Sequence, residues 1–138
     1  MTNKKIYITD NDVRRLRELI IVAREFGHEE EKYLHELEKE LDRGKIVKSK
    51  EIPSDVITMN SEVHLRDIKN KEEVVYKLVF PQDADASLGK ISILAPIGTA
   101  LLGYCVGDVV EWQVPAGLIK LKIEKILYQP EAAGDYHL

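Results

Sequence analysis

The sequence has few of the residues on which covalent cross-links, membrane spans and nucleic-acid-binding faces depend. Its 138 residues include one cysteine, Cys105, so no disulfide can form within the chain, and we expect a reducing compartment. No apolar run approaches the roughly 20 residues of a membrane-spanning helix, and no apolar signal segment follows the N-terminal lysines. A formal net charge of −4 disfavours binding by phosphate neutralisation. We therefore expect a cytoplasmic protein with no membrane partner and no sequence-specific DNA binding.

Patterns typical of enzymes and metal sites are also missing. The serines lie in no nucleophile-elbow context, and no paired base lies near Cys105 in the sequence. Gly98, Gly103 and Gly107 are not followed by the Gly-Lys-Ser/Thr ending of a phosphate-binding loop. The four histidines have no metal-ligand spacing. We predict no cofactor, no metal and no catalytic residue.

The first third of the chain contains the pattern of an amphipathic helix. Apolar residues recur there at spacings of three and four, as on one face of an amphipathic helix. They are Val13, Leu16, Ile20 and Ala23. Thr9 or Asp10 can cap the start of this helix, and Gly27 can end it.

A second helical pattern follows within a few residues. Leu34, Leu37 and Leu41 form its apolar stripe, and Gly44 ends it. Two helices joined by a tight link run antiparallel with their stripes facing each other. At about 1.5 Å per residue, helices of about 15 to 17 residues reach only about 22 to 26 Å. We predict that residues 1–50 form a short antiparallel helical hairpin, or coiled coil.

Beyond a charged connector over residues 45–53, the period changes from helical to strand-like. A short helix begins at Pro96, which suits a first helical turn, and Pro115–Gly117 is a hairpin turn. The predicted strands cover residues 56–59, 62–67, 74–80, 90–94, 109–114 and 118–128. The sequence therefore predicts an α+β protein in which residues 51–138 form an antiparallel sheet with one short helix.

Two features of this plan each allow two interpretations. Glu29, Glu30 and Glu31 lie at the hairpin tip. Their carboxylates either only keep an exposed tip hydrated or hold Mg²⁺, which prefers oxygen ligands. The apolar face of the short helix is either core or, if part of it stays exposed, a surface for a partner. Its residues are Pro96, Ile97, Leu101 and Leu102.

The second half of the chain resembles a known family. The residues that carry the resemblance are Gly89–Ile93, Pro96, Ala100–Gly103, Val106–Asp108 and Pro115–Gly117. These runs are similar to the carboxy-terminal domain of Gre-type transcription elongation factors. The resemblance implies an FKBP-like fold preceded by an antiparallel coiled coil.

Two further segments of the sequence are similar to the Rnk group, the short-armed members of the same superfamily. They are Asp55–Ser61 and Tyr128–Tyr136. The resemblance covers residues 52–138 well, whereas the hairpin is similar only in architecture. The group's name, regulator of nucleoside diphosphate kinase, suggests that kinase as a direct or indirect partner.

The resemblance implies RNA polymerase as the partner. Gre factors insert their coiled coil into the secondary channel of the polymerase, where acidic tip residues hold a catalytic Mg²⁺, and the globular domain docks at the channel rim. Carried over to this chain, the contact surface consists of Ala95, Pro96, Ile97, Leu101 and Leu102. The sequence departs from the family at Leu94-Ala95, where Gre members often have an acidic residue or serine before the proline.

A second departure is the arm. It is too short to carry Glu29, Glu30 and Glu31 deep into a channel, and consecutive acids do not share one helix face. We therefore expect docking without cleavage, in competition with longer-armed factors. Three alternatives stay open, namely transcript cleavage through the acidic tip, prolyl isomerisation suggested by the fold, and regulation of another protein such as nucleoside diphosphate kinase.

Overall fold

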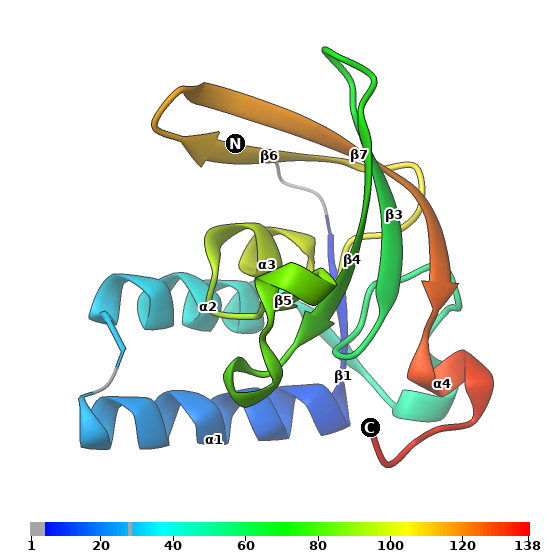
Figure 1. The fold of residues 1–138 in the computed structure, drawn as a ribbon. Helices are drawn as coiled ribbons and strands as arrows, with labels where there is room; N and C mark the ends of the chain where they lie inside the picture. Colours follow the sequence, from blue (N-terminus) through cyan, green and yellow to red (C-terminus); the bar gives the residue numbers. More distant parts are fainter. Residues whose placement is uncertain (1–4, 28) are drawn as a thin grey trace.

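The computed structural model describes residues 5–27 and 29–138, and it consists of a helical hairpin and a curled sheet with a short helix between them (Figure 1). The hairpin and the two strands that flank it are β1 (Tyr7–Thr9), α1 (Asp10–Phe26), α2 (Glu31–Arg43) and β2 (Lys45–Val47). The remaining strands and helices are β3 (Glu62–Asp67), β4 (Glu73–Val79), β5 (Lys90–Ser92), α3 (Pro96–Leu101), β6 (Val109–Val114), β7 (Gly117–Tyr128) and α4 (Pro130–Ala133). Short 3-10 turns lie at η1 (Ser49–Glu51), η2 (Pro81–Asp83) and η3 (Ala86–Leu88).

The ends of both hairpin helices are confirmed. The Thr9 side chain accepts a hydrogen bond from the Asp12 backbone N–H at 3.0 Å, which caps α1. Gly27 follows α1 with a left-handed φ of 66°, which glycine adopts at little cost. Gly44 follows α2. With 17 and 13 residues, the helices are about 25 and 20 Å long.

Two predictions about the strands were wrong. Residues 45–53, expected to be only a connector, contain β2, which pairs in parallel with β1 at Tyr7↔Lys45. The run at 56–59 forms no strand, and only Val56 makes an isolated bridge, to Cys105. Both errors arise from pairing between segments far apart in sequence, which a pattern of three or four residues does not reveal.

The main sheet has five strands in the order β5-β4-β3-β7-β6. The pairs β3–β4, β3–β7 and β6–β7 are antiparallel, but β4 and β5 are parallel, in register Lys77↔Lys90. The prediction of an entirely antiparallel sheet was therefore wrong. The chain between these strands passes through η2 and η3 and returns to the end at which β4 begins, so β5 runs in the same direction.

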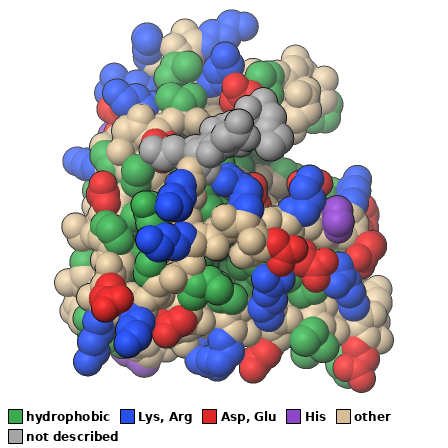
Figure 2. Space-filling view, turned by 180° about the vertical axis from the view of Figure 1, so that it is seen from behind, with side chains coloured by type: hydrophobic (Ala, Val, Ile, Leu, Met, Phe, Trp, Pro, Cys, Tyr) green, Lys and Arg blue, Asp and Glu red, His purple; other side chains and the backbone are tan. Residues whose placement is uncertain are grey.

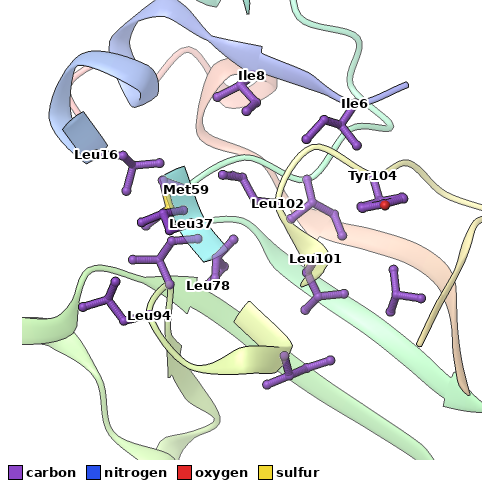
Figure 3. Packing of buried hydrophobic residues seen from close by; sticks show 14 of the residues in the cluster. Ile6, Ile8, Leu16, Leu37, Met59, Leu78, Leu94, Leu101, Leu102 and Tyr104 are labelled. Carbon is purple, nitrogen blue, oxygen red and sulfur yellow. The ribbon is translucent and has the colours of Figure 1, made fainter. Parts of the chain in front are cut away.

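One hydrophobic core joins the hairpin to the sheet. Leu16 of α1 and Leu37 of α2 lie in the same buried cluster as Met59, Leu78 of β4 and Leu101 of α3 (Figure 3). Each of these side chains is no more than 1% exposed, and burying one contributes about 1.5 to 3 kcal/mol. The hairpin is therefore packed onto the sheet region along α2 and α3. Among the described residues, no helix combines the length and apolar character needed to cross a bilayer.

Candidate functional site: the surface at Pro96 and the hairpin tip

The five residues predicted as a contact surface are divided by the structure. Ile97, Leu101 and Leu102 are buried in the core, with at most 4% exposure. Pro96 is exposed at the first position of α3, and Ala95 before it is half-buried. Only Ala95 and Pro96 are therefore open to a partner in this structure, and the three buried side chains support them from beneath.

Close packing holds α3 in place below this surface. The Thr99 hydroxyl donates a hydrogen bond to the Ile93 carbonyl oxygen at 2.6 Å. A Cβ on Gly98 would meet the Ser92 carbonyl oxygen at 2.2 Å, so the helix approaches the preceding segment as closely as only glycine allows. Pro96 is thus presented by a rigid element.

Pro96 lies on the wall of a groove between α2, α3 and β6. The groove has a volume of about 500 Å³, and Tyr33, Leu94 and Trp112 contribute apolar side chains to it, with Lys32 at one side. No sequence pattern linked the N-terminal turn of α2 to the proline of α3, because their proximity follows from the packing of the hairpin on the sheet region. The surface at Pro96 therefore includes aromatic groups from two further elements, Tyr33 of α2 and Trp112 of β6.

The three glutamates of the tip are exposed and do not converge. Arg24 Nη2 lies 2.6 Å from Glu31 Oε1, and Arg24 Nη1 lies 3.1 Å from Glu38 Oε2. The hydrogen bonds that Arg24 donates to Glu31 and then to Glu38 raise the pKa of Arg24, and the bond that Glu38 accepts from Arg24 lowers the pKa of Glu38. Glu30 lies 3.5 Å from Lys32.

This arrangement does not fit a Mg²⁺ site. A magnesium ion needs several oxygen ligands directed at one point, whereas the Glu31 carboxylate is directed at Arg24. Within residues 5–27 and 29–138, no group of three or more His, Cys, Asp or Glu side chains is placed to hold a metal ion. His28, beside the glutamates in the sequence, lies outside the described residues.

At the opposite end, a buried polar network connects the hairpin to the rest of the chain. Asp12 accepts hydrogen bonds from the Met59 backbone N–H at 3.0 Å and from Arg15 at 2.7 Å. Burial raises the pKa of the Asp12 carboxyl group, and the hydrogen bonds from Met59 and Arg15 oppose that rise. We call Thr9, Asp12, Arg15 and the groups that they contact the hairpin base.

The C-terminal segment completes this network. The Thr58 hydroxyl donates to Glu131 Oε1 at 2.7 Å, and burial raises the pKa of the Glu131 carboxyl group. Gln129 Nε2 donates to the Val56 carbonyl oxygen at 2.7 Å. Tyr128 donates to Asp135 at 2.5 Å, and this bond raises the pKa of Tyr128 to about 12. The segment after β7 thus fastens the loop before β3.

Charge is mixed over the face seen from behind in Figure 2. Lysine and arginine side chains lie interspersed with aspartate and glutamate across most of that face. A protein that follows a nucleic-acid backbone usually presents a continuous basic surface instead. No single sign of charge dominates the face in this view.

Comparison with known proteins identifies the relatives of this fold. A family model described as transcription elongation factor GreA/GreB, C-terminal, matches residues 52–128, more than half of the chain. The chain belongs to the GreA/GreB family. A second model, the Rnk N-terminus, matches residues 4–47, so the short hairpin is of the Rnk type.

Individual relatives support both assignments. A regulator of nucleoside diphosphate kinase from Escherichia coli (strain K12) is 45% identical over 103 residues, which are 74% of this chain and 76% of the relative. Transcription elongation factor GreA from Acetivibrio thermocellus is 41% identical over 93 residues, 67% of this chain but only 58% of that longer protein.

A solved structure confirms the fold. A prokaryotic transcription elongation factor GreA/GreB from Nitrosomonas europaea superimposes with a TM-score of 0.74 at 40% identity, over 89% of this chain and 99% of that one. The α+β plan with an N-terminal helical hairpin is confirmed, as is the resemblance to the Gre and Rnk groups.

Proposed function

We propose that the protein is a non-catalytic transcription regulator that binds RNA polymerase at the rim of its secondary channel. The observation that carries this proposal is the exposed Pro96 on a rigid α3, beside Tyr33 and Trp112, in a chain of the GreA/GreB family. Half-buried aromatic groups beside an exposed proline are typical of protein contacts. Leu94-Ala95 makes this surface more apolar than one with an acidic residue before the proline.

The form of the hairpin supports the part of the proposal that excludes transcript cleavage. Its helices are about 25 and 20 Å long, and their inner faces are packed into the core rather than extended from it. The tip glutamates are consecutive in sequence, and one of them, Glu31, forms an ion pair with Arg24. A regulator of this form competes with longer-armed Gre factors for the rim without delivering a catalytic metal to the RNA.

A binding assay with core RNA polymerase tests the contact. Pro96→Glu adds a negative charge beside Tyr33 and Trp112, in a groove that glutamates also line, while suiting the first turn of a helix, where an acid is favourable. We expect this variant to bind about tenfold more weakly. Pro53→Glu is the matched control, because Pro53 is also exposed but lies in the loop next to the C-terminal segment. Equal binding by all three proteins would refute the proposed surface.

The name of the Escherichia coli relative supplies a second candidate, regulation of a nucleoside diphosphate kinase. A pull-down with the full chain separates the two functions. Recovery of the kinase together with no recovery of polymerase would replace the polymerase proposal. Recovery of polymerase alone would make any effect on the kinase a consequence of transcription.

A further inference from the structure

The outward face of α1 near the tip carries large apolar side chains in contact with solvent. Ile21 is 65% exposed, Val22 50% and Phe26 63%. The inward residues of the same helix, Leu16 and Ile20, are almost fully buried. Val22 and Phe26, one turn apart, form an exposed apolar patch of a kind that marks interaction sites, and Ile21 lies on the same helix beyond them.

The patch forms one side of a surface groove. Val22, Phe26 and Leu19 form one wall, and Pro81 at the start of η2 forms the other. The cavity has a volume of about 390 Å³, enough for one large apolar side chain. It shares no lining residue with the groove at Pro96, so the two surfaces are separate.

The charges on this face are negative toward the tip. On the helix surface, Glu18 lies one turn before Ile21 and Val22, and Glu25 lies one turn after them, since residues three and four apart are neighbours. Both glutamates therefore lie on the strip of surface between these two apolar side chains. Glu29 lines the groove. Among the described residues, none of these three carboxylates forms an ion pair. The arginines of the same helix are held elsewhere: Arg17 by Asp42, and Arg24 by Glu31 and Glu38, all on α2.

At the other end of the helix Arg15 pairs with a carboxylate, whereas Arg14 bonds to a neutral amide. Arg14 donates to Asn11 at 2.5 Å. Arg15 donates to Asp12 and to the Leu138 carbonyl oxygen, and its guanidinium lies over the Phe80 ring. The Glu18 and Glu25 carboxylates therefore lie beside Val22, and the two arginines of α1 nearest the tip, Arg17 and Arg24, pair with α2 instead.

We propose that this face of α1 binds a basic amphipathic helix of a partner protein. An apolar ridge on such a helix fills the groove at Val22, Phe26 and Pro81, and its lysines or arginines meet Glu18, Glu25 and Glu29. A second copy of this chain fits poorly, because a two-fold contact through the same face brings like carboxylates together. This inference does not depend on the polymerase contact at Pro96.

Peptide binding to the full chain tests the inference. The probe is a helical peptide of about 18 residues with a leucine stripe flanked by lysines, titrated by fluorescence anisotropy. We expect binding that weakens with salt and that falls about tenfold for a Val22→Gln/Phe26→Gln variant. The Leu88→Gln protein, changed at an equally exposed apolar residue on η3, should bind like the parent.

Further arms separate the competing explanations. A Glu18→Lys/Glu25→Lys variant leaves the apolar residues intact and should also bind about tenfold more weakly at low salt. A peptide with the same lysines but scattered leucines should not bind; equal binding would reduce the effect to net charge and overturn the proposal. A concentration-dependent dimer that is lost in Val22→Gln/Phe26→Gln would assign the face to a second copy instead.

Discussion

The two ends of the helical hairpin are held by different kinds of interaction. At the hairpin base, Asp12 is fully buried and is bonded to the Met59 backbone and to Arg15. At the tip, Arg24 joins Glu31 and Glu38 through ion pairs that are open to solvent. Removing one partner from a buried charged network is costly, whereas exposed ion pairs contribute little.

This difference suggests a division of roles. The base fixes how the hairpin is oriented against the sheet, because the carboxylate of α1 bonds directly to the loop before β3. The charged side chains of the tip are exposed, so they can be substituted without unfolding the protein. Effects on stability should therefore concentrate at the base, and effects on binding at the exposed surfaces.

The largest effect is expected from Asp12→Ala. This change leaves the Met59 N–H and the Arg15 guanidinium without their acceptor, and we expect the free energy of unfolding to fall by about 3 kcal/mol. Urea denaturation measures it. Asn11→Ala, at the adjacent position, should change it by less than about 0.5 kcal/mol. If Asp12→Ala lowered the free energy of unfolding as little as Asn11→Ala does, the hairpin base would be held no more firmly than the tip.

A smaller effect, and one with a defined pH dependence, is expected from Glu131→Gln. Burial raises the pKa of Glu131 in the folded protein above its value in the unfolded chain. Its contribution to stability is therefore complete below the unfolded pKa and is lost as the pH rises through the folded pKa. Glutamine retains the oxygen that accepts from Thr58 and carries no charge.

We expect Glu131→Gln to be more stable than the parent by about 1 kcal/mol at neutral pH. The difference between the two proteins should shrink as the pH falls through the folded pKa of Glu131, as measured by urea denaturation at a series of pH values. A variant that is less stable than the parent at neutral pH, with a deficit that shrinks as the pH falls, would show that the ionised carboxylate of Glu131 is required.

Arg24→Gln should have a still smaller effect. Its partners, Glu31 and Glu38, are exposed and screened by salt. We expect a slight decrease in the urea midpoint at low salt that disappears at about 1 M salt. A large decrease that persists at high salt would mean that the tip is held as firmly as the base.

The smallest effect on folding and on polymerase binding is expected from the triple change Glu29→Ala, Glu30→Ala and Glu31→Ala. Glu30 precedes α2 without a side-chain capping bond, so little structure depends on it. Binding to core polymerase should change by less than about twofold, in contrast to Pro96→Glu. Loss of binding in the triple variant would move the contact from α3 to the tip.

Local chemistry explains which parts of this fold are predictable from the sequence. The Thr9 cap, the glycines after both helices and the β6–β7 hairpin around Pro115 depend on neighbouring residues, and all are present. The parallel pairs β1–β2 and β4–β5 depend on contacts between distant segments and were not predicted. Short runs such as Lys45–Val47 have too few residues to show a strand period.

The candidate site was predictable only in part for the same reason. The spacing of Ile97, Leu101 and Leu102 indicates an apolar face but not whether core or partner covers it, and the structure places all three in the core. Asp12 lies in the first turn of α1 and is nevertheless buried, because the Met59 N–H and Arg15 satisfy its carboxylate. Nothing in the sequence near Asp12 indicates those partners.

The most direct test is competition on a backtracked elongation complex. A labelled long-armed Gre factor is bound to the complex, and the protein is added in increasing amounts while the RNA length is followed. The account predicts that the Gre factor is displaced, that Pro96→Glu displaces it about tenfold less effectively, and that the RNA keeps its length once the Gre factor is gone. No displacement, or RNA shortening that the triple glutamate variant abolishes, would contradict it.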